Sequence, residues 1–142
     1  MPITKQRVYT LFASAGAHDP ADATTFYVGQ PFTMYPTQNT PDKSRVYFPK
    51  DGMVTAVDLT LYHETICTTE NLTTSIRINN TTDYAIQTKG LTAAEGSLTR
   101  FSNYLLAIPV TTADYFEIKV VCPTWATNPT TVRPTALVLV RH

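Results

Sequence analysis

The residues of this chain that could perform chemistry are three histidines, two cysteines and a few carboxylates, and they lie far apart in the sequence. The histidines are His18, His63 and His142, and the cysteines are Cys67 and Cys122. Residues of these types hold zinc when they recur at short spacings such as Cys-x-x-Cys or His-x-His, and neither spacing occurs. We therefore predict no metal site and no cofactor.

A carboxylate beside a histidine is the other pattern with catalytic potential. Glu64 follows His63, and Asp58 lies five residues before it. Neighbouring residues on a strand point to opposite faces, so we expect His63 and Glu64 to be separated and both solvated at the surface. The chain also lacks the short motifs of serine hydrolases, phosphate-binding loops and zinc proteases. We expect no catalytic residues and no enzymatic activity.

Composition limits the kinds of partner. Eleven basic and eleven acidic residues give a net charge of zero, and no basic cluster is present that would bind nucleic acid or an anionic membrane. No apolar run reaches the roughly 20 residues of a membrane span, and no signal peptide is apparent, so we expect a protein made in the cytoplasm. Charged residues make up only 15% of the chain, which suggests either that much of the surface is Thr, Asn and Tyr or that neighbouring subunits cover part of it.

The cysteine count argues against a disulfide scaffold. Cys67 and Cys122 allow one bridge at most, whereas small secreted scaffolds usually carry several. Two buried thiols fit this chain better, although the sequence leaves open whether the two cysteines pair.

Short runs of alternating apolar residues, separated by Gly, Pro and Asn turn signals, continue along the whole chain and predict an all-β domain. Asn79-Asn80 predicts a hairpin, and Asp51-Gly52 predicts a turn with a positive φ. Residues 91–95 could form one helical turn. The predicted strands cover residues 3–12, 26–28 and 31–35 (the last two as edge strands), 45–52, 53–63, 75–79, 81–87, 101–110, 114–121 and 135–140.

The alternation also predicts which side chains face the core. On the strand that begins at Met53, we expect Met53 and Val57 to point inward with Leu59 and Leu61, and Tyr62 to point outward. On the strand over residues 114–121, the predicted inward residues are Phe116, Ile118 and Val120, and the predicted outward residues are Tyr115, Glu117 and Lys119.

Several segments resemble small jelly-roll modules of tailed-bacteriophage virion proteins. They are Ile78-Asn-Asn-Thr-Thr-Asp-Tyr, the run from Ile108 to Lys119 and Pro123-Thr-Trp-Ala-Thr-Asn-Pro. The order of elements over residues 45 to 140 also resembles the tumour-necrosis-factor-like jelly roll, in which Ala-Gly-Asp commonly precedes an aromatic strand; here the matching residues are Ala113-Asp114-Tyr115. The resemblance implies an antiparallel jelly-roll β-sandwich of about eight strands over residues 25–142, preceded by an N-terminal arm or edge segment over residues 1–24.

This resemblance implies a virion structural protein, and members of the tumour-necrosis-factor-like group are generally homotrimers. One implied role is a capsid decoration (cement) protein on the outer virion surface, bound to the major capsid protein. The alternative is the tip of a tail fibre, bound to a host receptor or surface glycan. No heptad, collagen-like or β-helix repeats precede the domain, so we favour the decoration protein.

Five residues are candidates for a subunit interface. The jelly-roll alignment implies that Tyr62 and Tyr104 lie on the sheet facing a three-fold axis. Trp125, the single Trp, is either an interface anchor or a plug at the end of the sandwich. Val138 and Val140 belong to an almost wholly apolar final strand, which we expect to be covered by the core on one face and by a neighbouring subunit on the other.

Overall fold

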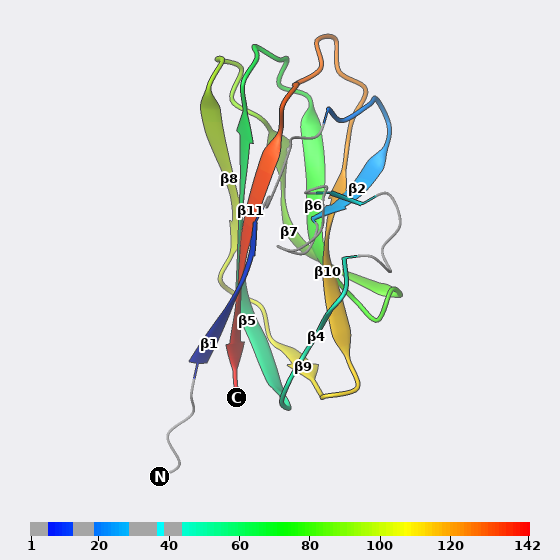
Figure 1. Cartoon of the computed structure of the whole chain (residues 1–142), viewed down its shortest axis with the longest axis vertical. Helices are drawn as coiled ribbons and strands as arrows, with labels where there is room; N and C mark the ends of the chain where they lie inside the picture. The colour runs from blue at the N-terminus through cyan, green and yellow to red at the C-terminus, as the bar shows by residue number, and fades with distance from the viewer. Residues whose placement is uncertain (1–5, 13–18, 29–36, 39–43) are drawn as a thin grey trace.

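The computed structural model describes residues 6–12, 19–28, 37–38 and 44–142, which form two antiparallel sheets packed face to face (Figure 1). In Figure 1, β8, β11, β5 and β1 lie on the left, and β6, β10 and β2 lie on the right. The strands are β1 (Gln6–Phe12), β2 (Thr25–Val28), β3 (Thr37–Gln38), β4 (Val46–Tyr47), β5 (Gly52–His63), β6 (Asn71–Ile78), β7 (Thr82–Gly90), β8 (Ser97–Asn103), β9 (Ile108–Val110), β10 (Tyr115–Val121) and β11 (Arg133–Arg141).

The strand order is that of a jelly roll. One sheet has the order β1-β11-β5-β8, with β9 beside β5. The other has the order β3-β2-β10-β6-β7, with β4 beside β10. Among the eight longest strands, only the β6–β7 hairpin stays within one sheet, and every other connection crosses between the sheets. The predicted antiparallel jelly roll of about eight strands is confirmed.

The core fills the space between the sheets with the inward side chains of both. Phe26, Leu59, Phe101, Phe116 and Ile118 are among its fully buried members. This arrangement follows from period-two alternation, because each strand presents every second side chain to the opposite sheet.

The alternation on β10 is confirmed, with one electrostatic addition. Phe116, Ile118 and Val120 are buried between the sheets. Glu117 points to the other side of the sheet and is nevertheless fully buried, and its Oε1 lies 3.4 Å from Nε of Arg45. A carboxylate that loses its water needs such a cation nearby.

The predicted hairpin at Asn79-Asn80 is also confirmed. Both residues have a positive φ, 54° and 55°, and they join β6 to β7. Asn tolerates this left-handed conformation, which a tight hairpin turn requires.

The predicted inward position of Met53 is wrong because β5 contains a bulge. Leu139 of β11 pairs with Ala56, whereas the next residue, Val140, pairs with Val54. One extra residue on β5 therefore reverses the alternation below it. Val54 is buried and Met53 is 38% exposed.

Gly52 begins β5 and does not have a positive φ, so the positive φ predicted for the turn at Asp51-Gly52 is wrong. The glycine is required by close approach instead, because a Cβ at this position would lie 2.4 Å from the carbonyl oxygen of Arg141. Among the described glycines, Gly96 is the one with a positive φ, 63°.

Three other local predictions differ from the structure. The strand predicted over residues 101–110 is two strands, β8 and β9, separated by residues 104–107. No helical turn forms at residues 91–95. The segment predicted as an edge strand at residues 26–28 is β2, which lies between β3 and β10. The strand predicted at residues 31–35 lies outside the described residues.

Candidate subunit interface

The outer face of the β1-β11-β5-β8 sheet, which we call the outer β11 face, gathers side chains from four strands into cross-strand rows. Its members come from the outward positions of each strand, and the pairing register places them side by side. The rows are Leu98, Tyr62 and Arg133; Arg100, Thr60 and Thr135; Ser102, Asp58 and Leu137; and Leu139 with Val8.

Large apolar side chains are exposed on this face and in the loop after β8. Leu98 on β8 is 66% exposed, and Val8 on β1 is 57% exposed. Tyr104 and Leu105 follow directly after β8, and Leu105 is 94% exposed. Single exposed apolar residues are common, but a group of them on one sheet face is typical of a surface that another molecule covers.

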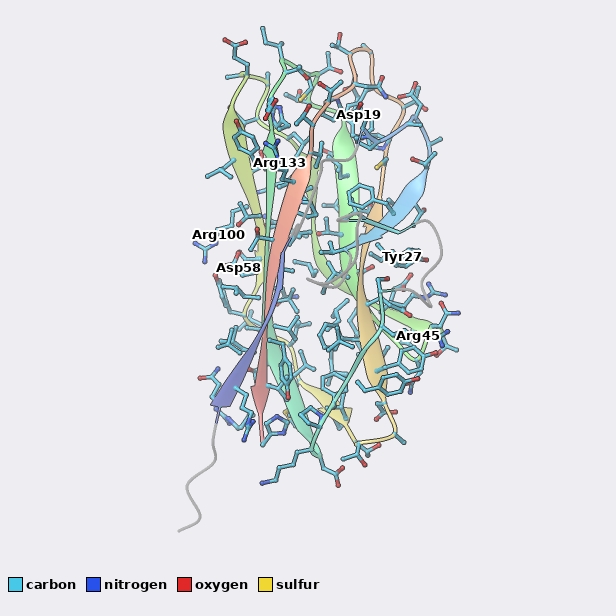
Figure 2. The ribbon with its side chains drawn as sticks, viewed as in Figure 1. Asp19, Tyr27, Arg45, Asp58, Arg100 and Arg133 are labelled. Carbon is cyan, nitrogen blue, oxygen red and sulfur yellow. The ribbon has the colours of Figure 1, made fainter. Side chains whose placement is uncertain are left out.

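A polar cluster lies in the same face, where Arg100 of β8 meets Asp58 of β5 (Figure 2). Nε of Arg100 donates hydrogen bonds of 2.9 Å to both carboxylate oxygens of Asp58. A second guanidinium nitrogen contacts Oδ2 of Asp58 and the hydroxyl of Tyr104. The Tyr104 hydroxyl in turn donates to Oδ2 of Asp58 over 3.0 Å.

These contacts fix the charge of Asp58. Hydrogen bonds from Arg100 lower the pKa of Asp58 below its ordinary value, against the opposing effect of partial burial, and the bond from Tyr104 adds to the lowering. The Asp58 side chain is only 14% exposed, whereas that of Arg100 is 61% exposed. The cluster therefore presents a guanidinium in a fixed orientation, with its counter-ion beneath it.

A second ion pair lies at the end of the face near the β10–β11 loop. Nη1 of Arg133 lies 2.6 Å from Oε1 of Glu64, and the guanidinium is 5.9 Å from the ring centroid of Tyr62. Both charged side chains are substantially exposed. The predicted solvation of Glu64 is therefore confirmed.

The structure places Tyr62 and Tyr104 on this one face, Tyr62 within the β5 row and Tyr104 on the Arg100 cluster. Contact of these residues with a second copy stays a prediction. Sequence reasoning did not single out Arg100, although the alternation of Leu98, Arg100 and Ser102 along β8 would have placed it beside the outward residues of β5.

Val138 and Val140 do not reach the outer face. Both are fully buried between the sheets. The outward positions of β11 belong to Leu137 and Leu139, which are partly buried. A run of apolar residues does not reveal by itself which alternate members face outward, because both sets are apolar.

Trp125 lies in the β10–β11 loop and is only 4% exposed, so within the single chain it closes one end of the sandwich. Its backbone N–H donates to Oδ1 of Asp22 over 3.1 Å, and that carboxylate also accepts a hydrogen bond from Asn128. The loop is thus held against the segment that precedes β2.

The prediction that His63 is solvated is wrong. The ring is fully buried, with Nδ1 2.7 Å from the carbonyl oxygen of Thr65 and Nε2 2.7 Å from that of Thr92. His63 continues the inward series of Leu59 and Leu61, and a carbonyl oxygen lies within hydrogen-bond distance of each ring nitrogen, so an N–H on either nitrogen finds an acceptor. It therefore connects β5 to the loop between β7 and β8.

Both cysteines are buried free thiols, as the sequence analysis favoured. Cys67 lies beside His63, with Sγ 4.0 Å from Nε2. Within the described ranges, which exclude His18, no group of three or more His, Cys, Asp or Glu side chains is placed to hold a metal ion. The described part of the chain contains no helix that is long and apolar enough to cross a membrane.

Comparisons with known proteins show the fold alone. No family model and no curated protein matches the chain. The structure of dimeric latent PorU from Porphyromonas gingivalis is similar with a TM-score of 0.53 at 8% identity, over 98% of this chain and 13% of that one. This chain therefore spans about an eighth of the length of PorU.

Two viral structures are also found. That of the infectious bursal disease virus Gx strain has a TM-score of 0.43 at 11% identity, over 96% of this chain and 32% of that one. That of the Gt strain has a TM-score of 0.44 at 15% identity, over 96% and 33%. The resemblance to phage virion modules stays a prediction. The sheets of this chain form an antiparallel β-sandwich, and PorU contains a part with a similar fold.

Proposed function

We propose that this protein is a virion structural protein that assembles as a homotrimer and decorates the outer surface of a phage capsid, where it binds the major capsid protein. The observation that carries the proposal is the outer β11 face. On this face Leu98 and Val8 are exposed, and the fixed Arg100–Asp58 cluster lies on the same jelly-roll sheet. Apolar side chains with Arg and Tyr among them are characteristic of the centre of a protein interface.

The opposite outer face, on the sheet that contains β10, also exposes apolar side chains, Tyr47 and Val121, and it carries a charged network. Asp83 on β7 forms ion pairs of 2.7 Å with Lys119 and 2.9 Å with Arg77. The side chains of Lys119 and Arg77 are only 18% and 20% exposed, so this network joins neighbouring strands of its own sheet. Because this network pairs its charges within the chain, we favour the β1-β11-β5-β8 sheet, where Leu98 and Val8 are more than half exposed, as the surface that identical copies cover. The sheet that contains β10 would then face solvent or the shell.

A decoration protein needs many modest contacts rather than chemistry. Closed symmetry repeats one contact in every copy, and multivalent attachment to a capsid multiplies weak contacts into stable binding. The homotrimer and the capsid contact are separate parts of the proposal, and each has its own experiment.

Self-association is tested by light scattering at micromolar concentration. We expect a species of three times the 15.8 kDa chain mass. Leu98→Asp, which places a charge on the outer β11 face, should shift the mass toward a single chain. Thr88→Asp, at an exposed position on β7, is the matched control and should keep the oligomer. A wild-type protein that remains at 15.8 kDa contradicts the homotrimer.

The capsid role is tested with phage heads that lack the protein. Added protein should bind these heads and raise their melting temperature. Binding to host cells or surface glycans, with no binding to heads, would contradict the decoration role and support the fibre-tip alternative.

A further inference from the structure

The first strand of the chain is attached to the rest of the described structure much as a bound peptide would be. β1 pairs with β11 alone, in an antiparallel register that runs from Gln6 opposite Arg141 to Phe12 opposite Thr135. In Figure 1, β1 lies along β11, and its start is at the same end as the C terminus. Main-chain pairing along one sheet edge is the way in which extended peptides bind to β-domains.

One side chain of β1 anchors it to the core. The ring of Tyr9 meets Phe48 and Phe116 edge to face, at centroid distances of 6.4 and 6.3 Å. Its hydroxyl lies 3.2 Å from Nε2 of His142. Its neighbour Val8 is largely exposed, so the backbone ladder and the aromatic contacts of Tyr9 hold this part of the strand.

The two open sides of the sandwich differ in how their edges are protected. On the β8 side, the backbone N–H of Ser102 donates to Oε1 of Gln87, and Nδ2 of Asn103 donates to the carbonyl oxygen of Ala85, so β7 and β8 are joined across the sheets. β1 carries neither a proline nor a bulge, two common devices that protect an edge strand.

We propose that β1 is exchanged between copies, so that β1 of one chain pairs with β11 of its neighbour in the homo-oligomer. The structure itself identifies the occupant, since residues 6–12 fit this edge and every copy carries the same segment. Exchange replaces each contact with an identical one, which makes it a low-cost way to join subunits. The pair of Val8 and Leu139 also belongs to the outer β11 face, so the exchanged strand would be continuous with the proposed interface.

This inference rests on the self-association in the proposed function and not on capsid binding. The test is the double variant Val8→Cys with Leu139→Cys in the full chain. These residues are directly opposed, at a separation that suits a disulfide. After oxidation, a non-reducing denaturing gel should show covalent species of two and three chains. The native Cys67 and Cys122 are buried, and wild-type protein treated in the same way should run as one chain.

The matched control is Thr60→Cys with Thr135→Cys, which opposes β5 and β11 of one chain and should give a single-chain band. A second experiment mixes the two single variants, Val8→Cys and Leu139→Cys, during refolding, and we expect a two-chain product. If the double variant closes within one chain while light scattering shows an oligomer, strand exchange is wrong and self-association stands. If light scattering shows single chains only, strand exchange and the proposed homotrimer both fail.

Discussion

Arg100 on β8 and Asp58 on β5 form a forked ion pair on the outer face of one sheet, with Nε of Arg100 2.9 Å from each carboxylate oxygen. The sheet register places the two side chains on adjacent strands, and Tyr104 completes the cluster. Because the carboxylate is mostly covered and the guanidinium is mostly exposed, the pair fixes the donor directions of Arg100 before any partner arrives.

Asp58→Asn should therefore weaken folding in a pH-dependent way. The pKa of Asp58 is lowered in the folded chain, so its contribution to stability is present above the ordinary aspartate pKa of about 4 and is lost as the pH falls through the lowered value. The free energy of unfolding of wild type should exceed that of Asp58→Asn at pH 7, and the difference should shrink below about pH 4. Urea denaturation at several pH values measures it. A difference independent of pH would contradict the assignment.

Gly90→Ala should destabilise the fold more than Gly96→Ala. A Cβ at Gly90 would lie 2.1 Å from the backbone carbonyl oxygen of Thr69, so the backbone must move, at a cost of about 3 kcal/mol. At Gly96 the nearest atom is 3.9 Å away, and only the positive φ of 63° is strained, at a cost of about 1 kcal/mol. Thermal melts of both variants test the order. Equal melting temperatures would contradict it.

Trp125 should tolerate Phe but not Ala. Among the described residues the indole N–H has no hydrogen-bond partner, so Trp125→Phe loses apolar contact but no described hydrogen bond from the ring. Trp125→Ala leaves a cavity at the end of the sandwich, at a cost of about 3 to 5 kcal/mol. Circular dichroism during denaturation compares the two. Trp125→Phe should also keep the oligomeric state, whereas its loss would show that Trp125 is an interface anchor.

The two thiols should be unreactive in the folded protein. Burial raises the pKa of Cys122 from 9.0 to about 12, and burial also raises the pKa of Cys67. A thiol reagent at pH 8 should modify neither residue until denaturant is added, and then both.

The raised pKa of Cys122 also means that the free energy of unfolding falls as the pH rises from about 9 toward 12. Cys122→Ala should lose less stability over this range.

Local patterns determined the class of the fold. The alternation from Tyr115 to Val121 and the Asn79-Asn80 turn depend only on neighbouring residues, so the strand faces and the hairpin could be predicted. The spacing of the turn signals also predicted an antiparallel sandwich of about eight strands, because each strand needs an opposite sheet to cover its apolar side, whereas the jelly-roll order was implied by the resemblance.

Other features were set by contacts between segments far apart in the chain. The bulge that turns Met53 outward exists only in the pairing of β5 with β11. Two carbonyls, one of them from the β7–β8 loop, allow His63 to be buried. The Arg100–Asp58 pair joins residues that are 42 positions apart.

The sequence thus determined that the chain folds as layered antiparallel strands, because alternation is a local property of the backbone. Only the tertiary structure decided which polar groups meet and which apolar side chains remain outside, because cross-strand register and loop packing bring together residues whose separation along the chain carries no such information.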